Sequence, residues 1–309
     1  MDHSCSDKRR RRLLKSAAAA AVMGLPGCSL VDKGDIRRRE IPSTSELLPV
    51  VGLGTSDVFE TAPEAGLTGL REVVKIFGNL GGELIDTAPS YGNAEENLGH
   101  LIGRLGLRDR LLIASKVDRN GERAGRQRMA LSEDRLGGSL DLMQVHNLID
   151  LQTQLATLRD WKAEGRIRYI GVTHYRVEAH EALARVMQEE PLDFVQFNYS
   201  IITPAAEQRL LPMAADKGIA VIINRAFEDG RLFARTRGRQ LPEWAGEFDA
   251  ESWAQFFLKY VLGHPAVTCV IPGTGDPHHM VDNMSAGVGK LPVTPDLRQR
   301  MRKLVADMS

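Results

Sequence analysis

Four residues able to hold or exchange a proton stand in or just after short apolar runs of the sequence. Asp86 lies in "ELIDTA", and Tyr91 follows it in "PSYGN". Lys116 lies in "LLIASKV", and His146 ends "LDLMQVH". A tyrosine has an ordinary pKa of about 10, but a nearby ammonium favours its phenolate form and lowers that pKa. If the four side chains lie together, acid-base chemistry follows.

The chemistry that fits these side chains is proton donation to a carbonyl oxygen. Lys116 can place an ammonium beside the phenol of Tyr91, and Asp86 can balance the lysine charge in an apolar setting. Tyr91 then donates a proton to the oxygen while His146 hydrogen-bonds it, which stabilises the charge that develops as hydride reaches the carbon. No residue of the chain supplies hydride, so this chemistry requires a nicotinamide.

The sequence alternates eight short apolar runs with longer stretches in which apolar residues recur every three or four positions. Near-continuous apolar strands alternating with helices predict an α/β fold with parallel pairing, a single (β/α)8 TIM barrel. A doubly wound open sheet is the alternative, but "GLGTSDVF" lacks the third glycine of a dinucleotide-binding turn. The predicted strands span 50–56, 83–88, 111–117, 140–146, 167–174, 194–200, 220–227 and 267–273. The clearest predicted helices span 67–80, 94–105, 151–165, 178–190 and 252–262.

A barrel places reactive side chains at the C-terminal ends of its strands. Asp86, Tyr91, Lys116 and His146 belong to the ends of three neighbouring predicted strands, so they fall on one rim. Taken singly, a strand-end aspartate is often a helix cap and a lone histidine often packs in a core. The shared placement favours a catalytic site.

These motifs resemble those of the aldo/keto reductase family. "DTAPSYGNAE", "ASKV" and "MQVHN" match the family's catalytic tetrad in order and strand context, and the resemblance runs from about Leu48 to the C-terminus. It implies an NAD(P)H-dependent oxidoreductase that reduces the carbonyl of an aldehyde or ketone to an alcohol, with Tyr91 as general acid. The alternative is a cofactor-binding sensor or accessory subunit with little turnover, against which the complete tetrad argues.

The resemblance also implies where the cofactor binds. "GVTHY" at 171 is similar to the nicotinamide-contacting "GVSNF" of the family, and "VIPGTGDPHHMVDN" at 270 resembles its adenosine-phosphate segment, where a helix N-terminus favours an anion. A glutamine in "VQFNYS" matches the one that binds the carboxamide. The implied cofactor-binding residues are Thr173, His174, Gln196, Gly273, Thr274, Gly275, His279 and Asn283.

Several positions depart from the family pattern. His174 replaces an asparagine, and Asn224 stands near where many members stack an aromatic ring on the nicotinamide. In the phosphate segment Asp276 is acidic, and His279 replaces the arginine that grips the 2′-phosphate; histidine is a weaker, pH-dependent anion ligand. We expect NADP(H) as cofactor with weak discrimination, and NAD(H) stays open.

The N-terminus resembles an export signal that must be set aside before the fold is read. A basic block over 8–12 precedes a short run of small residues that ends at Leu25, too short to span a bilayer. "RRRLLK" at 10–15 resembles the twin-arginine consensus, which implies the twin-arginine export machinery as a partner. "LPGC" resembles a lipobox that ends at Cys28. The alternative is a basic N-terminal arm.

These features predict three regions. Residues 1–28 form the export signal, residues 29–47 a polar linker and residues 48–309 the barrel. The predicted location is exported, either periplasmic or tethered to the membrane through Cys28. A cytoplasmic enzyme is the alternative.

Composition excludes several other classes of function. The 309 residues are 43% hydrophobic and 26% charged, typical of a globular enzyme, and the formal net charge is zero. No basic stripe beyond the N-terminus indicates nucleic acid, so a small carbonyl compound is the expected substrate. The three cysteines lie far apart without CxxC spacing, and a lysine ends the third predicted strand where a metal site needs a ligand. We therefore expect no metal.

Overall fold

The computed structural model describes residues 35–60, 63–138 and 140–308. These described residues belong to one compact unit. The predicted export signal, including Cys28, lies outside the described residues and stays a prediction. In the described part of the chain, no helix combines the length and the apolar character needed to cross a membrane.

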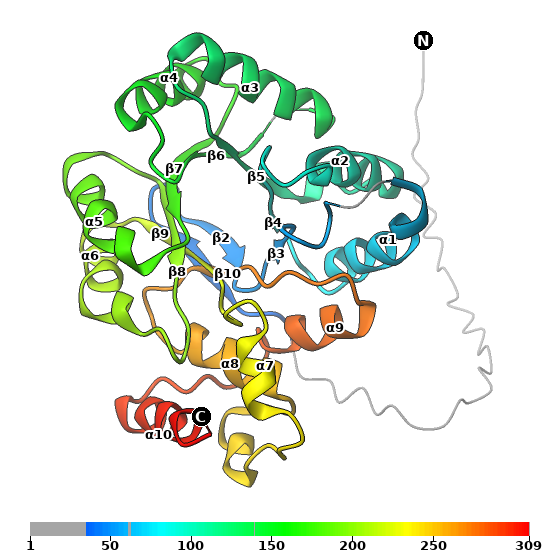
Figure 1. Ribbon diagram of the computed structural model, residues 1–309, viewed down its shortest axis with the longest axis vertical. Helices are drawn as coiled ribbons and strands as arrows, with labels where there is room; N and C mark the ends of the chain where they lie inside the picture. Colours follow the sequence, from blue (N-terminus) through cyan, green and yellow to red (C-terminus); the bar gives the residue numbers. More distant parts are fainter. Residues whose placement is uncertain (1–34, 61–62, 139, 309) are drawn as a thin grey trace, which may run out of the picture. The chain divides into compact units, whose positions relative to one another are not determined.

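Eight parallel strands form the centre of the unit, and each pairs with the next along the chain (Figure 1). Parallel bridges from Val51 to Val270 and from Gly54 to Gly273 join the first strand region to the last and close the ring. The eight predicted strands and the TIM barrel are confirmed. The strands are β3 (Leu53–Gly54), β4 (Leu84–Asp86), β5 (Leu112–Val117), β6 (Leu142–His146), β7 (Tyr169–His174), β8 (Phe194–Asn198), β9 (Ala220–Asn224) and β10 (Cys269–Val270).

Helices surround the strands (Figure 1). The five helices predicted from periodicity are present as α1, α2, α4, α5 and α8. Helix α3 has few apolar residues along its length, so its sequence carries little periodic signal. The α-helices are α1 (Pro63–Asn79), α2 (Ala94–Leu105), α3 (Glu122–Arg135), α4 (Leu151–Ala163), α5 (His180–Glu189), α6 (Leu210–Lys217), α7 (Arg231–Thr236), α8 (Trp253–Leu262), α9 (Pro277–Ser285) and α10 (Pro295–Ala306). Short 3₁₀ helices are η1 (Arg108–Arg110), η2 (Val177–Ala179), η3 (Ala205–Gln208) and η4 (Glu243–Phe248).

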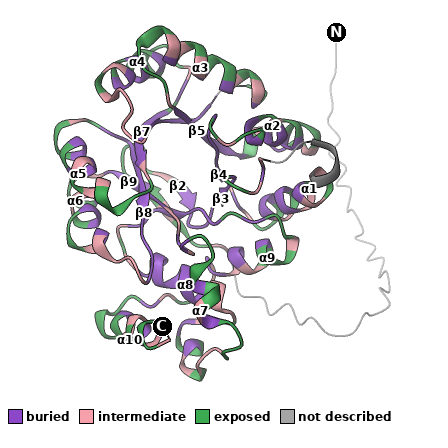
Figure 2. Ribbon diagram, viewed as in Figure 1, coloured by how far each residue is buried: buried purple, intermediate pink, exposed green. Residues whose placement is uncertain are grey.

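The barrel has two apolar layers. The larger layer lies between the strands and the helices, and Figure 2 shows the strands buried while the helices expose their outer faces. A smaller cluster belongs to the alternate residues of the strands, whose side chains point to the other face of the sheet. Its members include Leu84, Leu112, Leu142, Phe194 and Ile222. Packing on both faces explains why the strands read as continuous apolar runs.

A β-hairpin completes the smaller cluster. Strands β1 (Arg38–Ile41) and β2 (Glu46–Pro49) pair antiparallel, and the side chains of Ile41 and Leu48 are buried in the cluster. Arg39 donates to the backbone oxygen of Leu262 over 2.6 Å. The structure thus differs from the predicted linker over 29–47, because its part from residue 38 onward is folded. The segment is mostly polar, so its sequence did not indicate that Ile41 and Leu48 would be buried and hold the hairpin in place.

Candidate active site

Asp86 and Lys116 form a buried ion pair at the mouth of the barrel, by which we mean the C-terminal ends of β3–β10 and the residues that follow. Lys116 Nζ donates to Asp86 Oδ2 over 2.7 Å and to the backbone oxygen of Thr87 over 2.8 Å. The Lys116 and Asp86 side chains are 1% and 4% exposed. Burial lowers the pKa of Lys116, but Asp86 and Tyr91 together raise it above its ordinary value, so the lysine is charged at neutral pH.

Tyr91 and His146 border this ion pair. Tyr91 lies between β4 and α2, and the centre of its ring is 4.9 Å from Lys116 Nζ. His146 ends β6, and its ring meets that of Tyr91 edge to face, with centroids 6.1 Å apart. The structure therefore brings together the four residues predicted for proton chemistry, from three consecutive strands of the sheet.

Burial controls the protonation of the tyrosine and the histidine. It raises the pKa of Tyr91 by more than Lys116 lowers it, so the net pKa lies above the ordinary value. The expected net lowering is therefore wrong: the lysine acts in the expected direction, but desolvation is the larger effect. Burial, followed by the charges of Lys116 and His174, lowers the pKa of His146 to about 3. At neutral pH the tyrosine keeps its proton and the histidine is neutral.

Two glutamines hold the aspartate. Gln144 Nε2 and Gln196 Nε2 both donate to Asp86 Oδ1, over 3.1 and 2.8 Å. Gln144 lies two residues before His146 in β6, so both side chains emerge on the same face of the strand. Sequence reasoning missed Gln144. Its signal was a glutamine at an alternate position of an otherwise apolar strand.

Gln196 also connects the ion pair to the predicted nicotinamide site. Its Oε1 accepts from Thr173 Oγ1 over 2.8 Å and from Asn224 Nδ2 over 3.3 Å. Asn224 Oδ1 is buried and has no hydrogen-bond partner among the described residues. His174 ends β7, and its Nδ1 accepts from the backbone N–H of Arg176 over 3.2 Å. Thr173 and Gln196 therefore lie in one network with Asp86, whereas the hydrogen bond of His174 goes to the backbone of its own loop.

The predicted adenosine-phosphate segment follows β10 and leads into α9. Gly273 and Gly275 are exposed, whereas Thr274 is buried and its Oγ1 accepts from the backbone N–H of Asp276 over 3.1 Å. Asp276 caps α9, because its Oδ1 accepts from the backbone N–H of His278 over 2.7 Å. This hydrogen bond lowers the pKa of Asp276, so a carboxylate stands at the start of α9.

The last two predicted cofactor ligands lie on α9. His279 is exposed in its first turn, and Asn283 is 2% exposed further along. Helix α9 also packs against α1. The mouth therefore offers one set of polar groups around Gln196, on β8, and a second set after β10. Among the described residues, no group of three His, Cys, Asp or Glu side chains is arranged to hold a metal ion.

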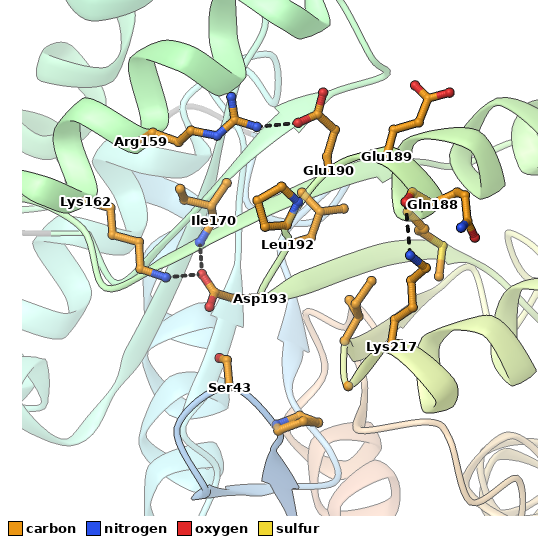
Figure 3. A pocket seen from close by; sticks show the side chains of 15 residues that line it. Ser43, Arg159, Lys162, Ile170, Gln188, Glu189, Glu190, Leu192, Asp193 and Lys217 are labelled. Atoms are coloured by element: carbon orange, nitrogen blue, oxygen red, sulfur yellow. Dashed lines mark hydrogen bonds and ion pairs between the residues drawn. The ribbon is translucent and has the colours of Figure 1, made fainter.

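A cavity of about 720 Å³ lies at the opposite end of the barrel (Figure 3). Side chains of α4, α5 and α6 line it together with the turn of the β1–β2 hairpin. Lys162 Nζ donates to Asp193 Oδ2 over 2.6 Å, and Arg159 pairs with Glu190. None of the predicted site residues lines this cavity, so it is separate from the candidate active site.

Comparison with known proteins gives one family. The model of the Aldo/keto reductase family matches residues 50–305. The NADH-specific methylglyoxal reductase of Escherichia coli (strain K12) is 31% identical over 178 residues, which cover 48% of this chain and 53% of that protein. Aldo-keto reductase YhdN of Bacillus subtilis (strain 168) is 27% identical over 194 residues, 58% of this chain and 56% of that protein. The chain thus spans about half the length of these curated relatives.

A solved structure extends the comparison over most of the barrel. The aldo-keto reductase from Klebsiella pneumoniae in complex with NADPH is 26% identical, with a TM-score of 0.70. The match covers 84% of this chain and 92% of that one. The two chains therefore share their architecture.

Proposed function

The chain belongs to the aldo/keto reductase family, and we propose that it reduces the carbonyl of an aldehyde or ketone to an alcohol with NADH or NADPH. The observation that carries the proposal is the buried pair of Lys116 and Asp86 next to Tyr91, with neutral His146 alongside. The E. coli relative is named for NADH and methylglyoxal, and the Klebsiella reductase was solved with NADPH. Both names support this reaction class.

Each residue of the tetrad has a defined task. When bound, the reduced nicotinamide supplies hydride to the carbonyl carbon. Tyr91 gives its phenolic proton to the carbonyl oxygen, so that C=O becomes CH–OH, and Lys116 stabilises the phenolate that remains. Neutral His146 donates a hydrogen bond to the same oxygen as negative charge develops on it. Asp86 keeps the lysine charged and fixed in position.

Side chains at the mouth fit a dinucleotide. The buried Oδ1 of Asn224 lacks a partner among the described residues, and such atoms call for a ligand or a water molecule. Asn224, Gln196 and Thr173 would hold the carboxamide. Thr274 and Asn283, which follow β10 at the same mouth, would hold the adenosine part of the dinucleotide. Both sets of residues would hold the dinucleotide without a rearrangement of the barrel.

The adenosine end bears on the choice of cofactor. A 2′-phosphate near the start of α9 would meet the carboxylate of Asp276, and the exposed His279 offers it an imidazole, which lacks the paired donors of a guanidinium. Repulsion between like charges offsets what the helix N-terminus contributes. We propose that the protein discriminates weakly between NADPH and NADH.

Oxidation of each cofactor by a panel of neutral aldehydes, methylglyoxal first, tests the proposed activity. We expect turnover with both NADPH and NADH. Tight binding of either dinucleotide without turnover of any aldehyde would instead assign the protein to the sensor or accessory class. Failure to bind either cofactor would contradict both.

We also propose that the protein is exported by the twin-arginine route and tethered through Cys28. The support is the sequence "RRRLLK" at 10–15 and the lipobox-like "LPGC". This route carries folded proteins, so a barrel can bind its nicotinamide before it leaves the compartment where the cofactor is made. Lipid chains on one cysteine would hold it at the membrane.

Cell fractionation tests the export proposal. We expect the full chain to reach the membrane, and a variant with Arg10→Lys and Arg11→Lys to stay in the cytoplasm. If both stay in the cytoplasm at full length, export is refuted in favour of a cytoplasmic enzyme. If Cys28→Ala is exported and still bound to the membrane, only the lipid tether is wrong.

A further inference from the structure

A groove lies between helices α1 and α2 on the outside of the barrel. Its volume is about 620 Å³, and the residues that line it all belong to these two helices. The helices lie side by side and pack against each other (Figure 1). None of the tetrad residues or predicted cofactor ligands lines this groove. A ligand bound there would therefore leave the proposed active site free.

The basic residues of the groove lack counter-ions. Arg71 of α1 and His100 and Arg104 of α2 line the groove and are exposed. In the part of the chain that the structure describes, none of the three has a hydrogen-bond or ion-pair partner. Glu96 also lines the groove, but it pairs with Arg135 of α3, with Nε and Oε1 3.3 Å apart. The groove thus carries an excess of positive charge.

The helix pair α3 and α4 balances its charges within the fold. Arg126 of α3 donates to Glu122 of the same helix over 2.9 Å and to Asp160 of α4 over 2.6 Å. Between α1 and α2, by contrast, Arg71 and Arg104 share one groove and have no carboxylate partner among the described residues. Like charges placed close together repel each other. An anion from outside the fold would supply the missing counter-charge.

The groove presents hydrogen-bond donors on two facing walls. His100 and Arg104 are four residues apart on α2, so their side chains emerge on the same face of that helix. Arg71 and the hydroxyl of Thr68 belong to the opposite wall, on α1. Leu101, which is 1% exposed, adds apolar surface to the lining. This arrangement suits an anion whose oxygens face both walls and which carries an organic part.

We propose that the groove binds the phosphate group of an organic phosphate monoester. Such a group has up to two negative charges and three acceptor oxygens, so it can receive hydrogen bonds from guanidiniums on both walls. A carboxylate has only two oxygens, and one guanidinium satisfies both. The same phosphate group occurs in soluble esters and in the lipid phosphatidic acid. The competing reading is that the basic residues only keep this face of the protein hydrated.

Substitutions of single arginines separate the two readings. Arg71→Gln and Arg104→Gln should each weaken binding about three- to fivefold, the range for an exposed charged pair, and the double variant about tenfold or more. The melting temperature should not change, because both side chains are exposed and unpartnered among the described residues.

Arg185→Gln is the matched control. Arg185 is exposed on α5, and it too has no partner in the described part of the chain. Figure 1 shows α5 on the other side of the barrel from α1 and α2. The substitution changes the net charge by the same amount, but at that separation salt screens its effect, so binding should change less than about twofold.

Calorimetric titration of the full chain measures the dissociation constant and the stoichiometry. The soluble probe is sn-glycerol 3-phosphate, and glycerol is its phosphate-free control. The lipid probe is co-sedimentation with phosphatidylcholine vesicles that contain or lack phosphatidic acid. Every variant keeps the basic block at 8–12, so the contribution of that block to vesicle binding cancels in the comparison.

The two probes identify the source of the phosphate group. We expect one equivalent of glycerol 3-phosphate to bind, with weaker binding in both groove variants, which assigns the site to a soluble ester. A loss confined to vesicles with phosphatidic acid, again in both groove variants and not in Arg185→Gln, assigns it to the lipid headgroup. Either result supports a phosphate site between α1 and α2.

Four outcomes would overturn the proposal. One is that the wild type binds neither probe more tightly than the phosphate-free control. A second is an unchanged dissociation constant in both groove variants. A third is equal weakening by Arg185→Gln, which leaves only a general attraction of anions to the protein. A fourth is displacement of glycerol 3-phosphate by saturating NADH, which places the anion at the mouth. None of these measurements depends on aldehyde reduction, so the groove can fail while the proposed function holds, and the reverse.

Discussion

The two ends of the barrel use polar side chains differently. At the N-terminal end, a polar residue just before β6, β8 and β10 accepts a hydrogen bond from a backbone N–H of the preceding strand. The strands are thereby tied together where they begin, and each acceptor is used. The pairs are Asp141 Oδ2 with Ile113 N at 2.9 Å, Asp193 Oδ2 with Ile170 N at 2.8 Å, and Thr268 Oγ1 with Val221 N at 2.9 Å.

At the mouth, polar groups are buried without being fully satisfied. Thr87 Oγ1, Asn147 Oδ1 and Asn224 Oδ1 are buried and lack a partner among the described residues. Each belongs to the last residue of a strand or the one directly after it. The mouth also holds the buried ion pair and the loop after β9, where Glu228 and Asp229 have positive φ. Polar side chains at the N-terminal end therefore stabilise the barrel, whereas those at the mouth leave buried groups that a ligand can bind.

The strongest test of this contrast is the loss of one oxygen atom at the mouth. Tyr91→Phe removes the proton donor and should lower kcat by a factor on the order of 10² to 10⁴, with dinucleotide binding nearly intact. The melting temperature should stay close to that of the wild type, because the ring remains. Steady-state kinetics and thermal unfolding measure the two quantities.

Lys116→Met offers a second view of the same step. It should lower kcat similarly, because the phenolate loses its cation, but it should also reduce stability by leaving Asp86 buried and uncompensated. Full aldehyde reduction by Tyr91→Phe would contradict the assignment of the tetrad.

Much of this arrangement could be predicted from the sequence. Asp86, Lys116 and His146 each end or nearly end an apolar strand. Eight such strands predict a barrel, in which all strands end on the same rim, so the three residues are expected there. The amide contacts of Gln144 could not be predicted, because the way an amide turns depends on packing between strands. The net pKa shift of Tyr91 is a balance of burial and charge, and strand patterns do not give burial depth.

A substitution at the N-terminal end should have the opposite signature. Asp193→Ala leaves the backbone N–H of Ile170 unsatisfied and removes the partner of Lys162, which should destabilise the protein by about 1–3 kcal/mol. Activity should stay within about twofold of the wild type after correction for the folded fraction. Chemical denaturation and kcat/KM measure these effects. A large loss of kcat in folded protein would break the contrast between the two ends.

A third test changes the ligand preference of the mouth without touching its chemistry. His279→Arg restores a guanidinium near the start of α9 and should improve NADPH binding about tenfold, with little change for NADH. His278→Arg is the matched control, since it adds the same charge at the neighbouring exposed position. Equal gains for both dinucleotides, or equal gains from both substitutions, would sink this placement of the 2′-phosphate.

The smallest expected effect is that of pH on the rate of reduction. The pKa of Tyr91 is raised, so the proton donor stays loaded until the pH exceeds its ordinary value of about 10. The pKa of His146 is lowered to about 3, so the histidine stays neutral down to that acidity. Between about pH 5 and pH 9, kcat at saturating cofactor should therefore vary less than about twofold, if the chemical step limits turnover.

Asp193→Ala sharpens this last test. The substitution lies at the N-terminal end, so it should leave the pH profile of kcat flat even as it lowers the melting temperature. A descending limb near neutral pH in the wild type would mean that the tyrosine loses its proton there, so that Lys116 outweighs burial once substrate is bound. The charge of Lys116, and not desolvation, would then be the larger effect on the pKa of Tyr91.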